Sequence, residues 1–196
     1  MSFPRFASIF AAFVLSLGCA AAAQQLSTVH KPPAPVDNDF VQKEFGSSCA
    51  LVGIPPVIAD MDGDGVDDIV IPARCTNPMM DQAENGFQVI DPYDGYFGYG
   101  NPKITTQFAS EDPERRGYAL LVIHGQGEHE WRSATPKAKF MIINLPYKEL
   151  QIKKWVQKKR QTFGIYVEET GGDKMTSVVF WDGKKYRYEP LGSTLE

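Results

Sequence analysis

The chain has 196 residues, and its 20 Lys and Arg against 24 Asp and Glu give a formal net charge of −4. This mildly acidic balance argues against nucleic-acid binding as the main purpose of the protein. The hydrophobic content of 43% and the aromatic content of 12% are ordinary for a globular protein. The length suits one domain with a proper core.

Residues 1–23 have the composition of a secretory signal peptide. Arg5 supplies the positive charge at its start, an apolar run covers residues 7–17, and the alanines at 21–23 offer a cleavage site. We therefore expect a mature chain that begins at Gln24. Loss of this segment leaves 19 basic and 24 acidic residues, a net charge of −5.

An extracytoplasmic location, periplasmic or secreted, follows from that signal. The residues before Cys19 fit a lipoprotein signal poorly, so a lipid anchor is disfavoured. No later apolar run is long enough to span a bilayer, and we expect no transmembrane segment in the mature chain. The next stretch, residues 24–38, is polar and proline-rich, which is typical of a flexible tail. Residues 39–196 are then expected to form a single domain.

An acidic loop at residues 60–68 is the most informative motif. Asp60, Asp62 and Asp64 place a carboxylate on every second residue, Gly65 permits a sharp turn, and Asp68 follows. This is how a short loop surrounds a hard cation with oxygen ligands. The alternative is an acidic turn without metal, in which the carboxylates repel one another and splay apart.

The flanking residues exclude an EF-hand. Ile71 stands where that loop needs a bidentate Glu, and Pro55 and Pro56 forbid a helix before the loop. The β-branched run at 69–71 is typical of a strand. We therefore expect a strand, a cation-binding loop and a second strand.

Residues 60–71 read DMDGDGVDDIVI. They resemble the FG-GAP or VCBS-type calcium loop, D-x-D-x-D-G-x-x-D before an apolar strand, which occurs in integrin α-chain propellers and in secreted bacterial proteins. The resemblance is confined to this loop. It implies Ca²⁺ as the cofactor, bound by Asp60, Asp62, Asp64, the carbonyl of Val66, and Asp68. A full propeller is excluded by length, since it needs at least four blades of roughly 40 residues, and we find no internal repeat.

Cys49 and Cys75 form an even pair in the exported chain, which favours a disulfide. If the strands beside the loop pair about a centre near Gly63, the residue opposite Cys75 lies near position 52, close to Cys49. Closing a loop of about 27 residues stabilises a protein by roughly 3.5 kcal/mol on the chain-entropy model. The alternative is two separate buried thiols.

An aromatic, glycine-rich segment spans residues 91–102. Flat aromatic side chains among bends suit binding of a sugar or a peptide. A lid that covers the core is the alternative. The aromatic residues proposed for partner binding are Tyr93, Tyr96, Phe97 and Tyr99.

The apolar run 118–123 is typical of a buried strand. The residues after it contain two histidines and two glutamates, which offer a transition-metal site or the cleft of a secreted hydrolase. The spacing is not H-E-x-x-H, and no G-x-S-x-G motif occurs, so a polar turn is the alternative. The residues concerned are His124, Glu128, His129 and Glu130.

Residues 148–160 carry six basic side chains and suit a strand or an amphipathic helix, with the surrounding strands favouring the strand. They could bind an anionic polymer or lipid, or form a solvated face. Further strands are expected at 139–145, 164–168 and 175–181. The last of these leads into Asp182 and Gly183, a favoured two-residue hairpin turn, after which a strand returns from Lys184.

The pattern as a whole predicts a mainly β fold, with α+β as the alternative. We expect a single antiparallel β domain of about six to eight strands with one calcium-binding hairpin loop. The expected function is that of an exported, non-catalytic calcium-binding domain, a structural or interaction module of the cell envelope or extracellular space. Its expected partner is an extracytoplasmic protein or glycan.

Overall fold

The computed structural model describes residues 36–97, 116–145, 147–157, 160–169 and 175–193. The expected signal peptide and residues 24–35 of the expected tail lie outside these ranges. Residue 36 already belongs to the fold, because the Val36 side chain is buried in the core. No helix in the described ranges is long and apolar enough to cross a membrane.

The fold is mainly β, which confirms the predicted class, but the strands form two sheets. The first has six strands in the order β1-β3-β5-β6-β4, with β2 also paired to β3. All its pairs are antiparallel except β4 with β6, which is parallel. Its strands are β1 (Cys49–Leu51), β2 (Val57–Ala59), β3 (Asp68–Cys75), β4 (Gln88–Ile90), β5 (Tyr118–His124) and β6 (Ala138–Ile143).

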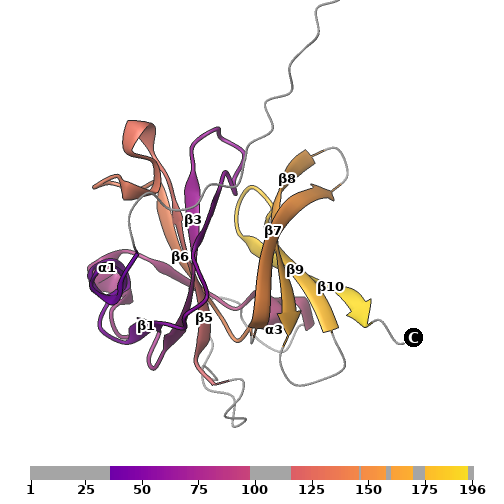
Figure 1. Ribbon diagram of the computed structural model, residues 1–196, viewed down its shortest axis with the longest axis horizontal. Helices are drawn as coiled ribbons and strands as arrows, with labels where there is room; N and C mark the ends of the chain where they lie inside the picture. The colour runs from indigo at the N-terminus through magenta and orange to yellow at the C-terminus, as the bar shows by residue number, and fades with distance from the viewer. Residues whose placement is uncertain (1–35, 98–115, 146, 158–159, 170–174, 194–196) are drawn as a thin grey trace, which may run out of the picture.

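The second sheet has four antiparallel strands in the order β10-β9-β8-β7. Figure 1 shows this sheet packed beside the first, with helix α1 on the opposite side of the first sheet. The six-stranded sheet is therefore the middle layer of three. The strands of the second sheet are β7 (Tyr147–Gln157), β8 (Arg160–Glu169), β9 (Met175–Trp181) and β10 (Tyr186–Ser193).

Both faces of the middle sheet are buried, which explains the uninterrupted apolar runs of its central strands. Ile69 and Ile71 of β3 enter a helix-side core that also contains Phe45 and Trp131. Val70, between them, enters a sheet-to-sheet core with side chains of the second sheet. The same alternation along β5 puts its side chains into the two cores by turns.

The described part of the basic segment, residues 148–157 and 160, is β-structure, as the surrounding strands favoured. It forms β7 and the start of β8, which pair from Tyr147 with Glu169 to Gln157 with Arg160. The predicted two-residue turn at Asp182 and Gly183 is wrong. The Asp182 carboxylate accepts hydrogen bonds from the amides of Lys184 and Lys185, at 2.9 and 3.0 Å. These bonds hold a four-residue connection, so that β10 begins at Tyr186.

Helix α1 (Asn38–Phe45) was not predicted. Asp37 caps it, because its Oδ1 accepts a hydrogen bond from the amide of Phe40 at 2.8 Å. Val41 and Phe45 form the buried face of the helix. The remaining helical elements are short: α2 (Gln82–Asn85), α3 (Pro92–Phe97) and the 3₁₀ helix η1 (Gly127–Arg132).

We expect the Asp37→Ala substitution to lower the free energy of unfolding by about 1 kcal/mol, since it removes the acceptor that satisfies a helix-end amide. Asp39→Ala, in the first turn of the same helix, is the matched control and is expected to cost less than half as much. Urea denaturation of both variants measures the difference. Equal losses would show that Asp37 acts by charge alone.

Candidate metal centre

The acidic loop lies at the tip of a β-hairpin, as predicted. Val57 pairs with Val70, and Ala59 pairs with Asp68, so that β2 and β3 are antiparallel about a centre close to Gly63. Gly63 and Gly65 have φ angles of 78° and 87°. These are left-handed conformations that glycine adopts without a steric penalty, and they let the loop fold back on itself.

The predicted disulfide joins Cys49 to Cys75. The two residues are direct partners in the antiparallel pair of β1 and β3. The bridge lies three positions from the register predicted from the hairpin centre, because residues 52–56 separate β1 from β2 and include the two prolines. The disulfide therefore fastens the base of the hairpin whose tip is the acidic loop.

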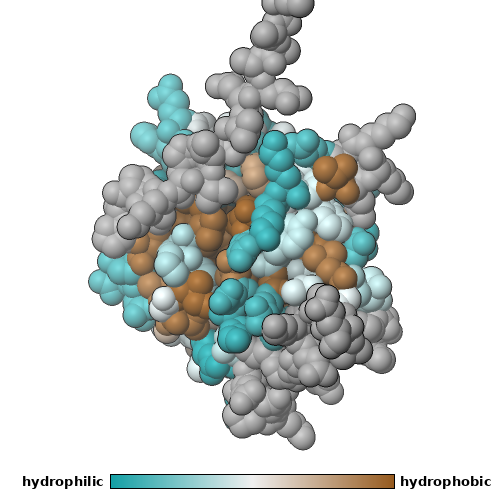
Figure 2. Space-filling model, turned by 45° about the vertical axis from the view of Figure 1, so that its right-hand side comes forward, coloured by the Kyte–Doolittle hydropathy of each residue, from teal (hydrophilic) through white to brown (hydrophobic). Residues whose placement is uncertain are grey.

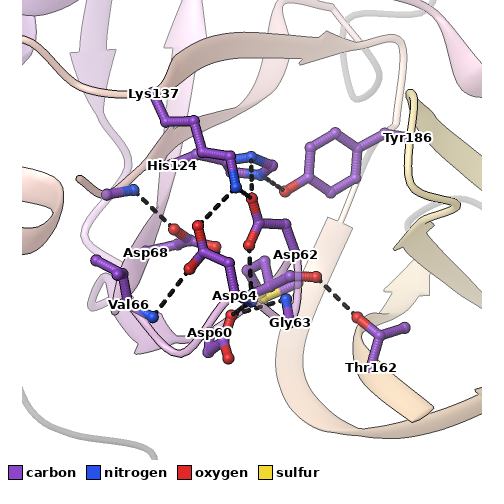
Figure 3. A network of polar contacts seen from close by, with 12 residues as sticks. Asp60, Asp62, Gly63, Asp64, Val66, Asp68, His124, Lys137, Thr162 and Tyr186 are labelled. Carbon is purple, nitrogen blue, oxygen red and sulfur yellow. Dashed lines mark hydrogen bonds and ion pairs between the residues drawn. The ribbon is translucent and has the colours of Figure 1, made fainter. Parts of the chain in front are cut away.

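Asp60 organises the loop from within. Its Oδ1 accepts hydrogen bonds from the amides of Gly63 and Asp64 at 2.7 and 3.0 Å, and its Oδ2 accepts one from Gly65 at 2.9 Å. Asp62 Oδ1 accepts from the amide of Asp64 at 3.2 Å. These turns bring oxygens of Asp60, Asp62 and Asp64 within 4.8 Å of one another, an arrangement that can hold a metal ion (Figure 3).

Val66 lies in the same loop. Its amide donates a hydrogen bond to Asp64 Oδ1 at 2.9 Å, which orients that carboxylate. The proposed use of the Val66 carbonyl as a ligand stays a prediction.

Lys137, just before β6, brings a positive charge to the carboxylates. Its Nζ lies 2.7 Å from Asp62 Oδ2 and 2.6 Å from Asp64 Oδ2, as Figure 3 shows. Partial burial acts to raise the pKa of Asp64, but the hydrogen bonds from Lys137 and Val66 bring that pKa below its ordinary value. The bonds to Asp62 and Asp64 raise the pKa of Lys137, which is therefore charged. Sequence reasoning missed this residue.

Asp68, the last residue of the loop and the first of β3, is the most deeply buried carboxylate of the group. Its Oδ2 accepts a hydrogen bond from the amide of Met61 at 2.8 Å, and its Oδ1 accepts one from Gly125 at 2.7 Å. Burial raises the pKa of Asp68 to about 8, further raised by the charge of Asp62 and opposed by the amide hydrogen bonds. Both oxygens accept hydrogen bonds from backbone amides, which favours the ionised form, whereas burial favours the protonated one.

His124, at the end of β5, joins the acidic loop to the second sheet. Its Nδ1 lies 3.3 Å from Asp62 Oδ2, and its Nε2 lies 2.7 Å from the hydroxyl of Tyr186 on β10. Burial lowers the pKa of His124 to about 4 although the charge of Asp62 acts to raise it, so the ring is neutral at pH 7. Thr162 of β8 adds a second tie, donating to the carbonyl of Met61 at 2.8 Å.

The structure separates His124 from the other three residues of the predicted histidine and glutamate cluster. His124 is buried, whereas Glu128, His129 and Glu130 are exposed on η1. In the described ranges, two groups can hold a metal: Asp60, Asp62 and Asp64, and a buried group of Asp62, Asp68 and His124. Four of the five predicted ligands, all but Val66, belong to these groups, and Asp62 is common to both. The hydrolase function stays a prediction.

Possible partner-binding surfaces remain predictions as well. Tyr96 on α3 is 52% exposed, with its ring 5.6 Å from that of Tyr188. The side chains of Tyr93 and Phe97, and all of Tyr99, lie outside the described part. Figure 2 shows hydrophobic side chains crossed by a band of hydrophilic ones on the face it presents. The described lysines of the basic segment are exposed on β7, and Lys148 lies 3.5 Å from Glu168.

No family model, curated protein or solved structure matches this chain.

Proposed function

We propose that the acidic loop binds Ca²⁺ and that the protein is an exported, non-catalytic calcium-binding domain, a structural or interaction module outside the cytoplasm. The main support for the proposal is that carboxylate oxygens of Asp60, Asp62 and Asp64 lie within 4.8 Å of one another. Converging carboxylates repel one another unless a cation lies among them. The sequence of the loop also resembles the FG-GAP or VCBS type of calcium loop.

The charge balance supports a divalent ion. Asp60, Asp62, Asp64 and Asp68 bring four carboxyl groups to the loop, while Lys137 brings one positive charge. Both oxygens of Asp68 accept hydrogen bonds from backbone amides, which favours its ionised form, although burial raises its pKa to about 8. A bound cation would favour that ionised form at neutral pH.

The donor atoms favour calcium over a transition metal. The three converging groups offer oxygen only, which suits a hard cation. The one nearby imidazole, His124, already has both ring nitrogens engaged, by Asp62 and by Tyr186. His124 would therefore act by orienting Asp62 rather than by binding the ion.

The disulfide supports an extracytoplasmic location, because disulfides persist in oxidising compartments. Extracellular calcium modules bind at roughly 0.1–1 mM. With a dissociation constant of about 0.1 mM and about 1 mM free calcium, binding adds about 1.4 kcal/mol to the stability.

Thermal unfolding of the full chain in 1 mM calcium and in chelator tests the proposal. We expect calcium to raise the melting temperature of the wild type by roughly 3–6 °C. Asp64→Asn keeps an acceptor for the Val66 amide and removes one charge, so the calcium shift should shrink or vanish. Asp39→Asn, an exposed carboxylate on α1, should keep the full shift. Identical melting of the wild type in calcium and in chelator would rule the proposal out.

A further inference from the structure

One cationic side chain lies among the proposed ligands. Lys137 Nζ is 2.7 Å from Asp62 Oδ2 and 2.6 Å from Asp64 Oδ2, which bridges two of the three converging carboxylates. The lysine is 75 residues from Asp62 along the chain. It is therefore not part of the local geometry of the loop, and it enters the cluster from another element.

The backbone fixes the place from which this side chain reaches the loop. The amide of Lys137 donates to the carbonyl of His124 at 3.0 Å, and the next residue, Ala138, pairs with His124 at the end of β5 and the start of β6. The same His124 contacts Asp62 through its ring. His124 therefore contacts both partners: its carbonyl holds the backbone of Lys137, and its ring contacts the Asp62 carboxylate that Lys137 binds.

The ammonium and a metal ion would use the same oxygens. A calcium ion needs carboxylate oxygens at 2.3–2.6 Å, and Asp62 Oδ2 and Asp64 Oδ2 are already bonded to Lys137. Two cations on the same pair of oxygens repel one another, so they bind in competition. The lysine side chain is 46% exposed, against 3% for Asp62. The ammonium group can therefore move into solvent when an ion binds.

We propose that Lys137 is a tethered ammonium that occupies part of the calcium site when the ion is absent, keeps the loop in its folded shape, and lowers the affinity for calcium by competition. This inference rests on the proposed calcium function. Lys137 thus has two opposite effects: it stabilises the calcium-free protein and weakens calcium binding.

Calcium titration calorimetry on the wild type, Lys137→Gln and Lys137→Arg tests the inference. Lys137→Gln removes the charge, so that calcium no longer has to break two partly exposed ion pairs when it binds. We therefore expect calcium to bind this variant roughly tenfold more tightly. Lys137→Arg keeps the charge and should bind within about threefold of the wild type. Lys139→Gln is the matched control, because Lys139 lies on β6 and its Nζ binds Glu44, 3.0 Å from its carbonyl oxygen and 3.3 Å from its carboxylate. It should leave the affinity unchanged.

Melting in chelator supplies the second readout. Lys137→Gln should melt below the wild type without calcium and approach it at saturating calcium. If Lys137→Gln binds calcium no more tightly than the wild type, the inference is overturned while the calcium function stands. If neither protein binds calcium, both the inference and the proposed function are overturned.

Discussion

Replacing Asp68 with alanine is expected to lower the free energy of unfolding by about 2–6 kcal/mol. The substitution leaves the buried amides of Met61 and Gly125 without the acceptor that each now has, and each unsatisfied buried donor costs about 1–3 kcal/mol. The two amides come from separate elements, the acidic loop and the segment after β5. Their common acceptor therefore holds these elements together. Chemical denaturation in chelator measures the loss without a contribution from calcium.

Asp67→Ala is the matched control for this prediction. Asp67 precedes Asp68 in the same loop but is only half-buried, and its replacement should cost less than about 1 kcal/mol. Asp68→Asn should fall between wild type and Asp68→Ala, because the amide keeps one acceptor oxygen and places a donor against the other backbone amide. A loss no larger for Asp68→Ala than for Asp67→Ala would contradict the role assigned to the buried carboxylate.

Removing the disulfide is the second large effect. The double substitution Cys49→Ser and Cys75→Ser is expected to lower the free energy of unfolding by about 3.5 kcal/mol, since the bridge spans a sequence separation of 26 residues and restricts the unfolded chain. Replacing both residues leaves neither half of the bridge as a lone thiol that could form intermolecular bridges.

Guanidinium denaturation of the double variant, compared with the wild type with and without dithiothreitol, checks this value. The reduced wild type and the double variant should unfold at similar midpoints, both well below that of the oxidised wild type. Coincident midpoints for oxidised and reduced wild type would show that the bridge adds nothing to the stability.

The hairpin could be predicted because its signals are local. Alternating aspartates, Gly63 and Gly65, and a β-branched run all lie within residues 60–71. Pairing about that centre brought position 49 near position 75. The predicted partner of Cys75 was three residues from Cys49, its partner in the structure. Counting residues outward from the hairpin centre assumes one uninterrupted strand, whereas residues 52–56 separate β1 from β2.

The other half of the site could not be predicted because its signals are not local. Lys137 reaches Asp62 across 75 residues, and His124 reaches Tyr186 across 62. These contacts depend on the pairing of β5 with β6 and on the packing of the second sheet against the first. Neither can be predicted from the spacing of residues along the sequence. The sequence places His124 beside Glu128, His129 and Glu130, whereas the fold places its ring against Asp62.

Two further features of the fold, the layer on each side of the middle sheet and helix α1, have signals in the sequence. Uninterrupted apolar runs in β3 and β5 indicate burial on both faces, which requires a further layer on each side of the sheet. Asp37 followed by Phe40, Val41 and Phe45 at helical spacing indicates a capped helix. The expected tail, which ends at residue 38, took in the capping residue and the first residue of this helix because of the prolines before them.

The most direct measurement is an anomalous difference map from crystals of the full chain grown with calcium. We expect a peak among the carboxylates of Asp60, Asp62 and Asp64, with the Lys137 ammonium moved away from Asp62. An empty loop in which Lys137 still bridges Asp62 and Asp64 at saturating calcium would contradict it.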